Sequence, residues 1–135
     1  MRVAADTHSI YWYLTNHGEL SPVALNALNE AEDSEGIVVS SWTVPELWLS
    51  STRKKPGRAV PRNAYEAVRT TLLDDENNIG IAPFDDAMWE HFEVVSMTLP
   101  DPFDSAIVAT ALAFDLEIVT YDDRITASGL VKVIW

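Results

Sequence analysis

The chain has 135 residues, of which 47% are hydrophobic, so it can form one compact domain that spans residues 1–135. It has no cysteine, which excludes disulfides, thiolate metal sites and cysteine nucleophiles. The 21 acidic residues against 9 basic ones give a net charge of −12, which taken alone argues against binding of nucleic acid through phosphate neutralisation.

Short apolar strands and helices alternate along the first part of the chain. We expect a strand at Val3–Ala5, followed by a helix through Ile10–Leu14. Ser21 and Pro22 are typical of a helix cap and a first helical residue, and predict a helix that continues through Ala31. The compact apolar run Ile37–Val39 then predicts a buried strand.

Ser40 and Ser41 are expected to cap the next helix, which carries Val44, Leu47, Trp48 and Ser51 at helical spacing. The segment Lys55-Pro56-Gly57 should break that helix. The later elements are expected in this order: a helix from Asn63 to about Asp75, a strand at Ile79–Ala82, a helix capped by Asp85 through Val95, a helix from Asp101-Pro102 to Phe114, and strands at Glu117–Thr120 and Val131–Ile134. This alternation predicts an α/β sandwich around a largely parallel sheet.

Acidic residues fall where such a fold places active sites, outside the carboxyl ends of the strands. Asp6 and Asp122 each follow a predicted strand, and Glu46 lies about one turn into the helix after another. Asp101 and Asp104 stand at a helix N-terminus, which shares that edge of the sheet. Carboxylates crowded together repel one another and raise each other's pKa unless a cation compensates for their charge. Mg²⁺ prefers oxygen ligands of this kind and can promote phosphodiester hydrolysis.

Each acid also has a structural interpretation. Asp101 before Pro102 suits a helix cap, and Asp104 suits the positive end of the helix dipole. Asp122 could belong to a turn, and Glu46 could lie on the surface of an amphipathic helix. Asp6 is harder to explain in this way, because an acid that ends a buried strand loses hydration. Their common edge favours metal binding for the set.

Four blocks of the sequence resemble the PIN domains of VapC-type toxins. They are Asp6-Thr7-His8 with Trp12 and Leu14, Pro45-Glu46-Leu47, Asp101-Pro102-Phe103-Asp104 running on to Ala111, and Val119-Thr120-Tyr121-Asp122 with Ile125. The blocks occur in the family's order and cover essentially the whole chain. The resemblance implies a PIN-like three-layer α/β/α sandwich with a mostly parallel sheet of about five strands.

The resemblance also implies a function. It implies a Mg²⁺-dependent endoribonuclease, in which Mn²⁺ can substitute, within a type II toxin–antitoxin module. The residues that match the catalytic and metal-binding acids are Asp6, Glu46, Asp104 and Asp122, with Asp101, Thr7 and Thr120 in supporting positions. RNA cleavage would leave 5′-phosphate and 3′-hydroxyl ends. The expected partners are the RNA substrate, a cognate antitoxin that masks the site and a second copy of the chain in a homodimer.

A basic segment offers one place for the RNA backbone. Arg53, Lys54 and Lys55 could guide the strand, although a solvated helix end explains them equally well. The chain lacks the pattern of a signal peptide and an apolar run long enough to span a bilayer, so we expect a cytoplasmic protein without a membrane partner.

Two other functions stay open. An aspartate-nucleophile phosphatase would use Asp6, but no second acid follows two residues later and no lysine lies near the other acids in sequence. An acidic, non-catalytic interaction module would bind a basic partner and hold no divalent metal tightly. Trapping a phosphoaspartate and titrating metal would separate these from the nuclease.

Overall fold

The computed structural model describes residues 1–53 and 59–135. The elements follow in the order β1 (Arg2–Ala5), α1 (Thr7–Thr15), the 3₁₀ helix η1 (His17–Glu19), α2 (Pro22–Glu32), β2 (Gly36–Ser40), α3 (Thr43–Thr52), α4 (Arg62–Leu72), β3 (Ile79–Ala82), α5 (Asp86–Ser96), α6 (Pro102–Ala113), β4 (Ile118–Val119), α7 (Asp123–Ser128) and β5 (Val133–Ile134). None of the helices in the described part of the chain is long and apolar enough to cross a membrane.

All five strands lie parallel in one sheet, in the order β3-β2-β1-β4-β5. The register places Ala5, at the end of β1, opposite Val39 of β2 and Val119 of β4. The carboxyl ends of the three inner strands therefore finish at the same level. This confirms the predicted sandwich and makes its sheet entirely parallel.

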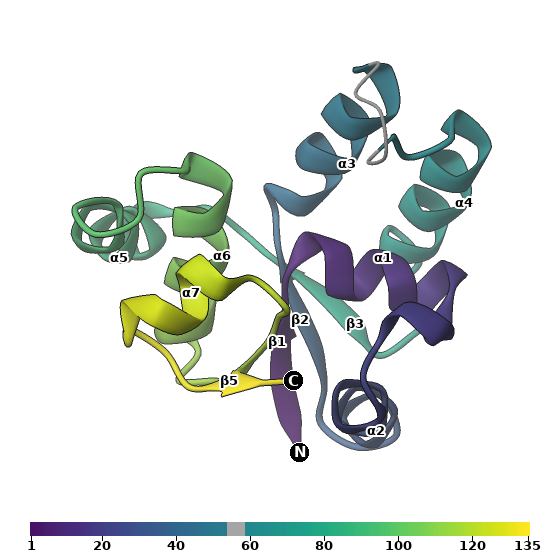
Figure 1. Cartoon of the computed structure of the whole chain (residues 1–135), viewed down its shortest axis with the longest axis horizontal. Helices are drawn as coiled ribbons and strands as arrows, with labels where there is room; N and C mark the ends of the chain where they lie inside the picture. Colours follow the sequence, from purple (N-terminus) through teal and green to yellow (C-terminus); the bar gives the residue numbers. More distant parts are fainter. Residues whose placement is uncertain (54–58) are drawn as a thin grey trace.

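Helices cover both faces of the sheet. In Figure 1, α5, α6 and α7 lie on one side of the strands, and α1 to α4 lie on the other. Alternate strand residues face the two layers: Val3 and Ala5 of β1 belong to one buried apolar cluster, whereas Ala4 between them belongs to the other. A strand buried on both faces has to be apolar throughout, which explains the continuous apolar runs in the sequence.

Side-chain caps explain several helix starts. As predicted, the side chains of Ser21, Asp85 and Asp101 accept backbone hydrogen bonds at the N-termini of α2, α5 and α6. The cap predicted for the helix after β2 is wrong. That helix, α3, follows Trp42 without a side-chain cap, and the Ser40 hydroxyl instead accepts a hydrogen bond from the Trp42 amide at 3.1 Å.

Other boundaries also differ from the prediction. The first helix, α1, is longer than expected because it begins directly after Asp6. Helix α4 ends at Leu72 rather than near Asp75, and the short helix α7 was not predicted. The predicted break at residues 55–57 lies outside the described residues.

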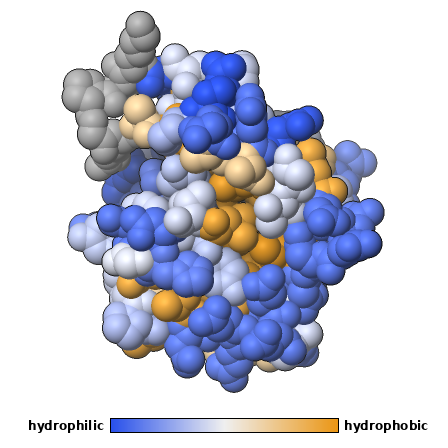
Figure 2. Space-filling model, turned by 90° about the vertical axis from the view of Figure 1, so that its right-hand side faces the viewer, coloured by the Kyte–Doolittle hydropathy of each residue, from blue (hydrophilic) through white to orange (hydrophobic). Residues whose placement is uncertain are grey.

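The outer surface is mainly polar. Figure 2 shows that the side of the molecule carrying α4 is largely hydrophilic, with an apolar area near the middle. Trp48 and Trp89 are exposed, whereas Trp42 is half-buried in a cluster with Phe84, Phe92 and Phe103.

Candidate active site

Asp6 lies at the carboxyl end of the central strand and is buried. It caps α1, because its Oδ1 accepts a hydrogen bond from the Ser9 amide at 2.8 Å. Its Oδ2 accepts a short hydrogen bond from the Thr120 hydroxyl, which lies just beyond β4. Both carboxylate oxygens are thus fixed by groups from two different segments.

Thr120 connects two of the predicted site acids. Its fully buried hydroxyl donates to Asp6 and accepts a hydrogen bond from the Asp122 amide at 3.0 Å. The hydroxyl therefore sets the position of the turn that carries Asp122 relative to the end of β1.

Asp122 and Asp104 come together through an arginine that the sequence interpretation missed. The Nη2 atom of Arg124 lies 3.2 Å from Asp122 Oδ2 and 3.3 Å from Asp104 Oδ2. Asp122 caps α7 by accepting from the Arg124 amide at 2.8 Å. The available signal was an acid at the start of a short helix with a basic residue in its first turn, but DRITAS is too short for a clear helical pattern.

Asp101 and Glu46 lie at the starts of two further helices, at the carboxyl edge of the sheet. Asp101 Oδ1 accepts from the amides of Phe103 at 2.8 Å and Asp104 at 3.1 Å, so its capping role is direct. Glu46 lies half-buried in the first turn of α3, where the Thr7 side chain acts on its carboxyl. The buried Thr7 hydroxyl acts on this carboxyl without forming a hydrogen bond of regular geometry within the described chain.

We use the name acid cluster for Asp6, Glu46, Asp104 and Asp122. Burial raises the pKa of Glu46 to about 7; the Thr7 side chain opposes this rise, and the charges of Asp104 and other nearby acids add to it. Burial also raises the pKa of Asp104 to about 6, with Asp122 adding to the shift and Arg124 opposing it. Asp6 and Asp104 thus act on Glu46, and Asp6 and Asp122 act on Asp104.

The other two pKa values shift in opposite directions. Burial raises the pKa of Asp6, although the hydrogen bonds from Ser9 and Thr120 oppose the rise. Partial burial also acts to raise the pKa of Asp122, but hydrogen bonds and the positive charge from Arg124 outweigh it and lower the pKa. The acid cluster therefore contains three carboxyls whose pKa is raised, Asp6, Glu46 and Asp104, and one whose pKa is lowered, Asp122.

The donor set fits Mg²⁺ better than a metal that needs a closed cage. In the described residues, no three Asp, Glu or His side chains form a ready-made metal-binding group. Mg²⁺ keeps several waters and commonly takes only one or two carboxylates directly. Oxygen donors and the repulsion between neighbouring acids therefore suit a partly hydrated hard cation.

Arg53 is the one residue of the predicted basic segment that the structure describes. Arg53 is exposed at the end of α3, roughly 10 Å along the helix axis from Glu46. Lys54 and Lys55 lie outside the described residues. His8 is exposed and forms no hydrogen bond in residues 1–53 and 59–135, where its ring contacts Trp12.

Solved structures share this fold at low sequence identity. A chain of VapBC2 from Rickettsia felis, bound to a DNA fragment from their promoter, matches with a TM-score of 0.69 and 16% identity, covering 98% of this chain and 97% of that one. A chain of DNA-bound VapBC from Salmonella typhimurium matches with a TM-score of 0.70 and 15% identity, covering 98% and 96%. A toxin–antitoxin complex from Klebsiella pneumoniae gives 0.65 and 17%, with the same two shares.

Sequence comparison gives the family directly. A search of curated proteins finds no sequence that matches the chain. The family model of the PIN domain, by contrast, matches residues 3–128, a range that contains every residue of the acid cluster. The chain belongs to the PIN domain family.

Proposed function

We propose that the protein is a Mg²⁺-dependent endoribonuclease of the VapC toxin type, active in a toxin–antitoxin module. The observation that carries the proposal is the meeting of Asp6, Glu46, Asp104 and Asp122 at one edge of the sheet, where neighbouring acids add to the raised pKa values of Glu46 and Asp104. The likeness in fold to chains of VapBC complexes supports the toxin assignment.

The four carboxylates would hold Mg²⁺, or Mn²⁺ in its place, directly and through water. When bound, the metal supplies positive charge that stabilises the phosphodiester oxygens and makes the attacking water more acidic. A neighbouring carboxylate of the acid cluster would accept the proton from that water. Attack in line on phosphorus would leave 5′-phosphate and 3′-hydroxyl ends.

Two neighbouring residues would support this chemistry. Thr120 holds Asp6 in a fixed orientation through its hydroxyl. Arg124 brings a guanidinium to the same edge and can pair with a phosphate oxygen of the substrate. The phosphatase alternative is weaker, because no second acid follows Asp6 by two residues and no lysine lies near the other acids in sequence.

The test is cleavage of total RNA by the purified, antitoxin-free protein in Mg²⁺, Mn²⁺ or EDTA. We expect metal-dependent cuts at a few sites, lost in Asp104→Asn and kept in Glu66→Gln, which removes an exposed acid of α4 far from the cluster in sequence. Sequencing the cut ends would identify the target. Cleavage by Asp104→Asn at the rate of the unaltered protein would reject the assignment.

The proposed partners are a cognate antitoxin that covers the acid cluster and a second copy of the chain. The chains matched in VapBC structures come from assemblies with antitoxins, which supports the first. Expression of the unaltered chain alone should arrest growth, and Asp104→Asn should not. Light scattering on the purified protein would give the mass of a dimer or a monomer.

A further inference from the structure

Four aromatic rings form a continuous row beside the acid cluster. The Tyr121 ring lies 5.2 Å from Trp135, Trp135 lies 6.2 Å from Trp12, and Trp12 lies 5.6 Å from His8, all measured between ring centroids. The residues come from three segments: the turn after β4, the end of β5 and helix α1. We call them the aromatic row.

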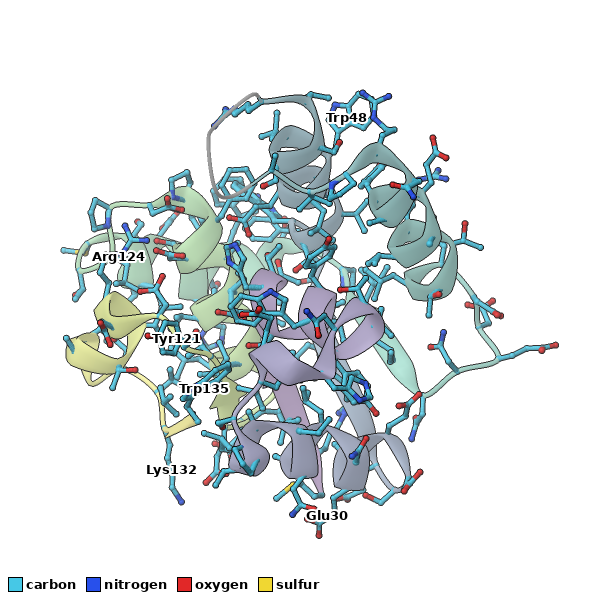
Figure 3. The ribbon with its side chains drawn as sticks, turned by 45° about the vertical axis from the view of Figure 1, so that its right-hand side comes forward. Glu30, Trp48, Tyr121, Arg124, Lys132 and Trp135 are labelled. Carbon is cyan, nitrogen blue, oxygen red and sulfur yellow. The ribbon has the colours of Figure 1, made fainter. Side chains whose placement is uncertain are left out.

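The aromatic row begins and ends next to site residues. Tyr121 stands between Thr120 and Asp122, and His8 is two residues from Asp6. In Figure 3, Arg124, Tyr121 and Trp135 follow one another down one side of the molecule. A ligand that covers the row would therefore extend into the edge that carries the acids.

Packing does not account for the exposed end of the row. The Tyr121 residue is 65% exposed and belongs to neither apolar cluster of the core. Trp12 and Trp135 pack against one cluster and are half-buried, so they have both a core side and an outer side. An aromatic ring left in water gives up the free energy that burial would supply.

The rings also leave their faces accessible to a ligand. Neighbouring rings in the row are tilted by 50°, 57° and 43°. Parallel stacking would cover each face with the next ring, whereas tilted rings cover one another only in part. Flat, apolar ligands can then lie against the uncovered faces.

We propose that the aromatic row binds unpaired bases of a single-stranded RNA next to the phosphodiester that the acid cluster cleaves. This inference rests on the proposed function and names how the substrate is held. Unpaired bases stack on aromatic side chains with little sequence preference, whereas paired bases in a duplex hide their faces. A chain with a net charge of −12 gains little from phosphate neutralisation, so stacking has to supply much of the affinity.

The test measures binding separately from cleavage. Fluorescence anisotropy would follow a labelled single-stranded RNA of about 12 nucleotides on the Asp104→Asn protein with Mg²⁺ present. An abasic strand of equal length and the same RNA in a duplex serve as probes without accessible bases. Tyr121→Ala should weaken binding of the single strand by roughly 5- to 100-fold, the loss expected for one stacked base.

Tyr121→Phe is the matched control, because it keeps the ring and removes only the hydroxyl. We expect it to bind as the parent does, and we expect the abasic strand and the duplex to bind weakly to all three proteins. Equal binding by the Tyr121→Ala protein and its parent, or tight binding of the abasic strand, would overturn the proposal. If the unaltered protein cleaves RNA but binding gives such a result, RNA binding by the aromatic row is rejected and the nuclease assignment stands. If binding depends on the bases but no cleavage occurs, the nuclease assignment is rejected and RNA binding by the aromatic row stands.

Discussion

Binding of a divalent metal to the acid cluster should release about one proton at about pH 6.5. A carboxyl must lose its proton to become a metal ligand, and two of the carboxyls hold protons near neutrality. At this pH Glu46, with a pKa of about 7, is about three-quarters protonated, and Asp104, with a pKa of about 6, is about one-quarter protonated. The two fractions add to about one proton, and the raised pKa of Asp6 can only increase the number.

The affinity for metal should follow the same two groups. At about pH 8 both are mainly ionised, whereas at about pH 5 roughly one part in a hundred of Glu46 and one in ten of Asp104 is ionised. If both groups are ligands, affinity should fall up to about 1000-fold between these pH values. Lower pH weakens binding because protons compete for the same oxygens.

Isothermal titration with Mn²⁺ measures this directly, because the heat depends on how strongly the buffer takes up released protons. Titrations at about pH 6.5 in two buffers of different ionisation enthalpy give the proton count. In Glu46→Gln the count should fall by about three-quarters of a proton, whereas Glu66→Gln should leave it unchanged. Tight binding of Mn²⁺ without proton release would refute the reasoning, since the raised pKa values would then belong to groups that the metal does not use.

Four further predictions concern the same edge and the sheet beneath it. Without metal, the free energy of unfolding should fall by up to a few kcal/mol from about pH 5.5 to pH 8, because folding raises the pKa of Glu46 and Asp104 and the folded state therefore holds more protons. Urea unfolding in EDTA at the two pH values would measure this loss of stability, and Mg²⁺ should make the loss smaller. Arg124→Ala should bind Mn²⁺ several-fold more tightly at about pH 8, because the guanidinium no longer competes with the metal for the carboxylates of Asp104 and Asp122. Weaker binding of Mn²⁺ by this variant in the calorimetric titration would contradict this. Thr120→Val should cost roughly 1–3 kcal/mol of stability by thermal or urea unfolding, because it leaves Asp6 without its hydroxyl donor; an unchanged midpoint would mean that the bond contributes nothing. Gly36→Ala should cost roughly 1–3 kcal/mol in the same assay, because φ is +102° there and the added Cβ would lie 2.9 Å from Asn78 Oδ1; a stabilised variant would contradict this strain.

Local signals were sufficient to predict most elements of the fold. A Ser-Pro or Asp-Pro pair specifies a helix start within a few residues, and the caps at Ser21 and Asp101 act as expected. The start of α3 could not be predicted in this way, because it follows Trp42, which offers no capping oxygen. There the core packing of the aromatic cluster outweighs local preference.

The candidate site could be predicted only as a set of positions. In a parallel sheet, acids that directly follow strands lie at its carboxyl edge, and in the structure Asp6 and Asp122 lie just beyond the ends of β1 and β4. The bridge made by Arg124 between Asp104 and Asp122 depends on where a side chain reaches across two elements, which no spacing in the sequence specifies. The raised pKa of Glu46 likewise depends on burial and on neighbours from other segments.

Structural and functional interpretations of these acids need not compete. Asp6, Asp101 and Asp122 each cap a helix, and Glu46 and Asp104 lie in the first turn of one. A helix N-terminus carries partial positive charge, which lowers the cost of holding a carboxylate there. Because the helices of a parallel α/β fold start at the carboxyl edge of the sheet, capping alone gathers acids at that edge. The arrangement that stabilises the helix starts therefore also gathers oxygen atoms that could bind a divalent cation. A substitution at a capping acid should accordingly be judged by both unfolding and metal titration.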